Sequence, residues 1–167
     1  GDGIRDKDGQ KLTIDYTTSP IWEEAFNELL AGYLTKAGFD VQMRAMDDAG
    51  IAEEAAAGNY GMLYMYWTRA DPSPLRILFH SDNIEGGSAY TRFKNEELDA
   101  ALADGDTQTD EAKRKEDYVT AQRIIMDNAL VLPLFAINTS YLNAPTVENF
   151  TFDVEGYPWL YDISLAQ

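Results

Sequence analysis

The sequence contains no cysteine, and this absence excludes several kinds of chemistry at once. Without thiols the chain has no disulfide framework, no thiol nucleophile and no thiolate zinc site. Histidine is nearly absent too, since His80 is the only one. The sequence also lacks a G-x-S-x-G motif and any metal-ligand pair at helical spacing. We therefore predict that the chain is not an enzyme, and we interpret His80 as a surface or packing residue.

Basic residues are scarce, because 13 Lys and Arg stand against 29 Asp and Glu and give a formal net charge of -16. A negative field of this size repels phosphate backbones and anionic lipid surfaces. We therefore expect no nucleic-acid partner. Adjacent acids at positions 47–48, 53–54 and 96–97 flank predicted helices, where a solvated surface explains them better than a catalytic carboxylate pair.

Long apolar runs are absent as well. No segment approaches the roughly 20 apolar residues of a membrane span, so we expect no direct membrane insertion. No charged-then-apolar leader opens the chain. The sequence starts abruptly inside a predicted turn at residues 1–3, and we expect it to be part of a longer protein. Its 167 residues are enough for one domain with a real core.

The first half of the sequence alternates between strand and helix patterns. Strands are predicted at residues 12–17 and 39–45 from period-two alternation, and at residues 62–67 from a continuous apolar run typical of a strand buried on both faces. Between them, one helix is predicted from Ser19-Pro20 to Gly38 and a shorter one over residues 51–57. This order predicts an α/β fold with a mostly parallel central sheet flanked by helices.

The second half of the sequence is predicted to be mainly helical. The predicted helices are residues 75–79, a helix capped by Asn95 with Leu98, Ala101 and Leu102 on its buried face, and residues 110–128. Residues 130–135 are predicted to form another buried strand, with Pro133 at a sheet edge or strand end. The last segment, residues 146–167, alternates weakly, is rich in aromatic residues and has little helical signal.

One segment combines aromatic, cationic and anionic side chains directly after the apolar run at 62–67. Ligands of open α/β sheets bind at the carboxyl ends of the strands, which is where this segment is predicted to lie. Arg69 is suited to pair with a ligand carboxylate and Asp71 with an amine. The alternative is that the aromatic residues belong to the core and that Arg69 and Asp71 form a local salt bridge. The residues predicted to form the ligand wall are Tyr66, Trp67, Thr68, Arg69 and Asp71.

The acidic opening segment offers a second kind of site. Residues 6–9 resemble the start of a Ca²⁺ loop, because Ca²⁺ takes several carboxylate and carbonyl oxygens, and Asp2, Asp6 and Asp8 are the candidate ligands. Lys11 stands where a further ligand would follow. A structural turn recruits Asp and Gly equally well. Ca²⁺ is the only cofactor that the sequence suggests, and a stand-alone acidic Ca²⁺-binding interaction module is the alternative function.

Several stretches, taken in order, resemble a known family, the peptide, dipeptide and nickel type of extracellular solute-binding protein (family 5). Residues 1–12 are similar to the junction by which these proteins enter their C-terminal lobe. Residues 67–72, with the letters WTRADP, resemble the tryptophan-to-Asp-Pro loop of the family. The other stretches that carry the resemblance are residues 29–41, 75–81, 90–99, 114–122 and 129–134.

The resemblance implies a clamshell receptor of an ABC importer, which closes on a peptide or other small-molecule ligand and delivers it to a membrane permease. Residues 1–149 would form the C-terminal, domain III-like ligand-binding lobe, and residues 150–167 a tail that crosses the hinge to the other lobe. The implied location is periplasmic or extracytoplasmic, with membrane association through the importer. Arg69 and Ala70 stand where peptide-binding members carry an extra acid, so an oligopeptide, a sugar and a metal chelate all remain open as ligands.

Overall fold

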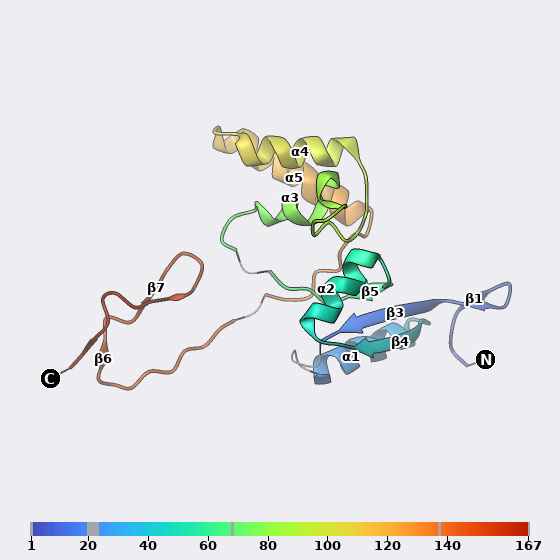
Figure 1. Ribbon diagram of the computed structural model, residues 1–167, viewed down its shortest axis with the longest axis horizontal. Helices are drawn as coiled ribbons and strands as arrows, with labels where there is room; N and C mark the ends of the chain where they lie inside the picture. The colour runs from blue at the N-terminus through green and yellow to red at the C-terminus, as the bar shows by residue number, and fades with distance from the viewer. Residues whose placement is uncertain (1, 20–23, 68, 137, 167) are drawn as a thin grey trace. The chain divides into compact units, whose positions relative to one another are not determined.

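The chain divides into two compact units that alternate along the sequence. The computed structural model describes residues 2–19, 24–67, 69–136 and 138–166 (Figure 1). Unit 1 comprises Gly1–Tyr66 and Asp82–Arg92, and unit 2 comprises Trp67–Ser81 and Phe93–Gln167. The predicted division between a lobe at residues 1–149 and a tail at residues 150–167 stays a prediction.

Unit 1 is built on a three-stranded parallel sheet with β3 (Thr13–Thr18) in the middle. β4 (Asp40–Ala45) pairs with β3 along its whole length, and β5 (Met62–Leu63) pairs on the other side. Parallel neighbours need long crossover connections, which α1 (Glu24–Lys36) and α2 (Asp48–Ala57) supply. An antiparallel hairpin of β1 (Asp6–Lys7) and β2 (Gln10–Lys11) precedes the sheet. The predicted α/β fold with a parallel sheet and helices is confirmed.

A buried hydrogen bond joins β3 to α1. Tyr16 is fully buried, and its hydroxyl donates to Asn27 Oδ1 at 2.5 Å. Burial raises the pKa of Tyr16, so the phenol stays a neutral donor. The predicted end of α1 is confirmed, because the helix stops at Lys36 and Gly38 has a φ of +98°, which glycine adopts without strain. The predicted helix start at Pro20 lies outside the described residues.

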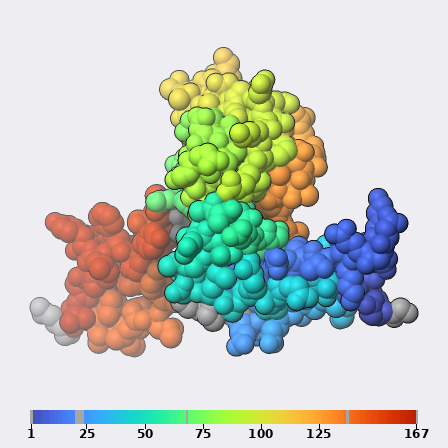
Figure 2. All heavy atoms as spheres, turned by 45° about the vertical axis from the view of Figure 1, so that its right-hand side comes forward, coloured from blue at the N-terminus to red at the C-terminus, as the bar shows by residue number. Residues whose placement is uncertain are grey.

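Three helices of unit 2 pack around one apolar core. They are α3 (Pro74–Phe79), α4 (Glu96–Thr107) and α5 (Glu111–Asp127), and a 3-10 turn, η1 (Ser81–Asn83), follows α3. α4 and α5 lie side by side in Figures 1 and 2. Leu98, Leu102 and Ala121 are completely buried at the centre of this core. Leu98 and Leu102 lie on the predicted buried face of α4, which is confirmed.

Side chains just outside α4 and α5 set where these helices begin. Asn95 Oδ1 accepts a hydrogen bond from the backbone N–H of Leu98 at 2.9 Å, which confirms the predicted cap. Asp110 Oδ1 accepts one from Lys113 at 3.1 Å in the same way. α2 starts three residues before the predicted position 51 because Asp47 caps it through its side chain. The starts of these three helices therefore follow from local side-chain chemistry.

The C-terminal segment of unit 2 forms two short antiparallel ladders. β6 (Val147–Glu148) pairs with β9 (Ser164–Leu165), and β7 (Thr151–Phe152) pairs with β8 (Pro158–Trp159). The rings of Phe150 and Phe152 meet edge to face, with centroids 5.3 Å apart. None of the helices in the described part of the chain has the length and apolar content needed to cross a membrane.

Two of the predicted strands are wrong. Residues 62–67 form only the two-residue strand β5, which lies at an edge of the sheet, and Met65, Tyr66 and Trp67 are each more than 40% exposed. Residues 130–135 form no strand, and most of them are exposed. A continuous apolar run indicates a segment that would be stabilised by burial, but burial needs a covering layer. The described residues supply no such layer over these two segments.

Candidate functional site

The predicted ligand wall begins at Tyr66, three residues after the end of β5 at Leu63. Tyr66 is the last residue of the first stretch of unit 1, whereas Trp67, Arg69 and Asp71 belong to unit 2. The side chains of Tyr66 and Trp67 are 46% and 44% exposed, so these two aromatic residues are not part of a core in the described chain. Thr68, the remaining member of the predicted wall, lies outside the described residues.

Arg69 is paired with a residue that the sequence did not suggest. Its Nη1 donates to both carboxylate oxygens of Glu155, at 3.2 and 3.3 Å. The two residues are 86 positions apart, so no periodicity or motif links them. Only sequence information that relates distant positions to one another could have identified Glu155 as the partner of Arg69. Arg69 therefore already binds a carboxylate, which is the chemistry predicted for it toward a ligand.

Asp71 is held by the start of α3. Its Oδ1 accepts a hydrogen bond from the backbone N–H of Ser73 at 2.7 Å. Hydrogen bonds from the hydroxyl and the backbone N–H of Ser73 lower the pKa of Asp71, so this carboxyl group is ionised at neutral pH. The alternative of a local Arg69–Asp71 salt bridge is not what the structure shows, because Arg69 binds Glu155 and Asp71 binds Ser73. Asp71 is exposed and can accept a further donor.

The acidic opening segment folds as a hairpin turn. Asp8 and Gly9 both have positive φ between β1 and β2, as expected of a tight turn rich in Asp and Gly. Asp2 pairs with Lys11 at 3.1 Å, and hydrogen bonding to the N–H of Ile4, followed by Lys11, lowers its pKa. Among the described residues no group of three or more His, Cys, Asp or Glu could hold a metal ion.

His80 is a buried residue between α3 and η1, which is the packing role predicted for it as one of two alternatives. Its Nδ1 lies 3.9 Å from Asp99 Oδ1. The carboxylate of Asp99 also accepts hydrogen bonds from the backbone N–H and the hydroxyl of Ser81, at 2.8 and 2.5 Å. Because Asp99 belongs to α4, these contacts tie His80 and Ser81, which follow α3, to α4 within unit 2.

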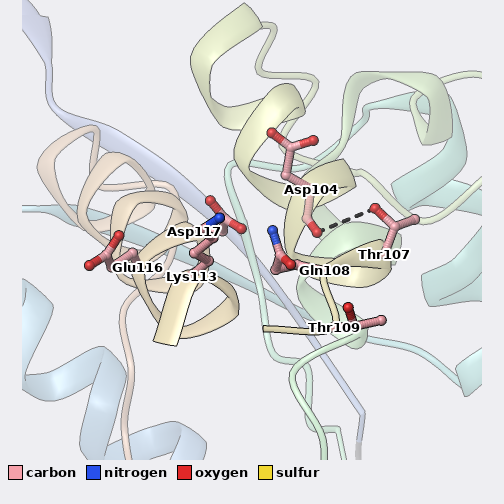
Figure 3. Close-up of a pocket in the computed structure, with 7 residues that line it drawn as sticks. All are labelled: Asp104, Thr107, Gln108, Thr109, Lys113, Glu116 and Asp117. Carbon is pink, nitrogen blue, oxygen red and sulfur yellow. Dashed lines mark hydrogen bonds between the residues drawn. The ribbon is translucent and has the colours of Figure 1, made fainter. Parts of the chain in front are cut away.

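A separate pocket of about 540 Å³ lies at the junction between the end of α4 and the start of α5 in unit 2 (Figure 3). Three carboxylates, Asp104, Glu116 and Asp117, line it together with Lys113 and residues 107–109. Every lining side chain is polar or charged, whereas small-molecule sites are lined mostly by apolar and aromatic groups. The exposed aromatic segment that starts at Tyr66 is therefore the better candidate for ligand binding.

The parallel sheet with crossover helices gives the chain a periplasmic-binding-protein-like fold, which it shares with solved structures. No family model matches the chain. The "Probable di/tripeptide-binding protein 5" of Pseudomonas aeruginosa is 28% identical over 110 residues, which are 64% of this chain and 21% of that protein. The "Probable D,D-dipeptide-binding periplasmic protein DdpA" of Escherichia coli is 26% identical over 148 residues, 85% of this chain and 28% of DdpA.

Solved structures agree on the fold. The oligopeptide-binding protein AppA from Bacillus subtilis, solved in complex with a nonapeptide, matches with a TM-score of 0.74 and 21% identity, over 100% of this chain and 34% of AppA. The chain thus spans about a fifth to a third of the length of these proteins. The resemblance predicted from the sequence is confirmed: the matching proteins are peptide- and dipeptide-binding solute-binding proteins of the ABC type, and this chain is similar to one part of them. The curated relatives are named as binding proteins, two of them periplasmic.

Proposed function

We propose that this chain is one ligand-binding lobe of the substrate-binding component of an ABC importer. In this role it captures a peptide or similar small solute against a second lobe and delivers it to a membrane permease, and it catalyses no reaction. The observation that carries the proposal is that curated relatives named for binding peptides match up to 91% of this chain. The location proposed with it is the periplasm or another extracytoplasmic space, with membrane association through the importer.

The exposed segment after β5 supplies the chemistry that a peptide requires. Trp67 and Tyr66 offer aromatic faces for an apolar side chain, Arg69 a guanidinium for a carboxylate, and Asp71 an ionised carboxylate for an amine. Within unit 2, Asp71 is held by the backbone N–H of Ser73 at the start of α3, and Arg69 is held by Glu155. A sugar would contact mainly the aromatic faces, and a metal chelate would contact mainly the charged groups.

The proposal predicts that Trp67→Ala weakens the binding of alanyl-alanine to this chain by about fivefold or more, because the variant loses an aromatic contact surface. NMR titration of the backbone amides measures the change. Trp159→Ala is the matched control, since Trp159 is similarly exposed but lies in β8, and its affinity should stay unchanged. Equal affinities for the wild type and Trp67→Ala would contradict the assignment of Trp67 to the ligand wall.

A single lobe is expected to bind weakly, because it offers part of the contacts while most of the entropic cost of capture remains. We expect a dissociation constant for alanyl-alanine on the order of millimolar or weaker. Isothermal titration calorimetry with the 167-residue chain tests this expectation. Micromolar binding would show that the chain forms a complete site by itself and would overturn the two-lobe part of the proposal.

A further inference from the structure

We propose that the carboxylate of Glu155 and the carboxylate of a ligand compete for Arg69. Glu155 would then act as an internal substitute for the acidic end of the ligand. This inference rests on the proposed function, because it takes Arg69 as part of the ligand wall. It adds a residue, Glu155, that sets how strongly the site selects carboxylate-bearing solutes.

The geometry of the ion pair permits exchange. Both hydrogen bonds come from Nη1 of Arg69, whereas the strongest Arg–carboxylate pairs use two nitrogens in a parallel fork. The side chain of Arg69 is 55% exposed, so a small carboxylate reaches it directly from solvent. A ligand that engages two guanidinium nitrogens can therefore replace Glu155 without first opening a buried contact.

Glu155 is presented by an ordered turn. Asp153 Oδ1 accepts hydrogen bonds from the backbone N–H groups of Glu155 and Tyr157, each at 2.9 Å. The backbone N–H of Asp153 also donates to the carbonyl of Tyr157 at 2.9 Å, and Gly156 has a φ of +84°. These contacts close the loop between β7 and β8. The side chain of Glu155 is consequently held near Arg69 at little further cost in backbone entropy.

The size of the effect follows from the exposure of the pair. Exposed ion pairs are weak, so removal of Glu155 is expected to strengthen carboxylate binding by about two- to fivefold and no more. Removing any acid from a chain of net charge -16 also favours anions in general. Glu148→Gln, in β6, makes the same charge change away from Arg69 and corrects for this general effect. Glu155→Asp keeps the charge and shortens the side chain.

NMR titration of the 167-residue chain with two half-peptide probes tests the competition. N-acetylalanine carries a carboxylate and no amine, and alaninamide carries an amine and no carboxylate. Backbone amide shifts report binding in every variant, and the Nε–Hε signal of Arg69 reports it where Arg69 is retained. We expect N-acetylalanine to bind about two- to fivefold more tightly to Glu155→Gln than to the wild type, with a smaller gain for Glu155→Asp, little change for Glu148→Gln and loss in Arg69→Gln. Alaninamide should bind the wild type and Glu155→Gln equally.

Two outcomes would overturn the inference, and they differ in whether Arg69 is still a carboxylate subsite. Equal affinity of the wild type, Glu155→Gln and Glu148→Gln for N-acetylalanine, with a clear Arg69 shift, would remove the competition and keep Arg69 as a carboxylate subsite. No Arg69 shift in any variant would remove the carboxylate subsite as well. The proposed function is then decided separately by alanyl-alanine binding to the wild type and Trp67→Ala.

Discussion

Tyr118 illustrates how single residues in the helical core are tuned. Burial, and then the hydrogen bond from its hydroxyl to Asp106 Oδ1 at 2.8 Å, raises its pKa to about 12. Its ring also packs on Gly105, where an added Cβ would lie 3.1 Å from the ring, so a larger residue there would push the tyrosine away. The buried position of Tyr118 therefore accounts both for its raised pKa and for the glycine at position 105.

The raised pKa of Tyr118 predicts alkaline instability. Because the folded pKa lies above the ordinary value of 10, the contribution of Tyr118 to stability is complete below pH 10 and is lost as the pH rises from 10 to about 12. Absorbance at 295 nm should show a late tyrosinate signal that is smaller by one tyrosine in Tyr118→Phe and that shifts in part to lower pH in Asp106→Asn. An unchanged alkaline titration in Tyr118→Phe would contradict this assignment.

The candidate site also shows the limit of prediction at the residue scale. The segment from Tyr66 to Asp71 was found because its aromatic and charged residues adjoin one another in the sequence. The residues that pair with this segment were not predicted. Glu155 is 86 positions from Arg69 in the sequence. Ser73 is close to Asp71 in the sequence, but no distinctive pattern marks it as a hydrogen-bond donor. The local sequence therefore predicts which kinds of functional group the segment offers, whereas tertiary contacts determine which residue each charged group pairs with.

At the scale of elements, the helices and the alternating strands could be predicted and the continuous apolar runs could not. α3 and α5 lie within one residue of their predicted bounds. α4 and α5 begin directly after Asn95 and Asp110, because each of these residues caps its helix through a contact three residues away. The strand predicted at 62–67 is wrong because an apolar run carries no information on whether another segment covers it, and Met65, Tyr66 and Trp67 are exposed in the described chain. Period-two alternation, by contrast, needs only one buried face.

The core between α4 and α5 is predicted to carry much of the stability of unit 2. Leu102→Ala removes a completely buried side chain from α4 and should lower the free energy of unfolding by about 2–5 kcal/mol. Val119→Ala is the control, because Val119 is 55% exposed on α5 and its truncation should change stability by roughly 0.5 kcal/mol or less. Urea denaturation measures both. Equal losses for the two variants would contradict the assigned core.

At the scale of the whole molecule, the net charge of -16 predicts how the chain responds to divalent cations. Ca²⁺ and Mg²⁺ at equal concentration should raise the melting temperature equally, because both screen the same diffuse repulsion. Differential scanning fluorimetry tests this expectation. A Ca²⁺-specific rise that disappears in Asp6→Ala and Asp8→Ala would instead favour the Ca²⁺-binding interaction module.

The alternation of the two units along the chain has a consequence for biosynthesis. Unit 1 is completed by Asp82–Arg92, and the hydroxyl of Tyr60 donates to the carbonyl of Tyr90 in that later stretch. A nascent chain therefore cannot finish unit 1 until Arg92 has left the ribosome, by which time α3 of unit 2 has already been synthesised. The two units must mature with overlapping timing, and no single proteolytic cut can release either one intact.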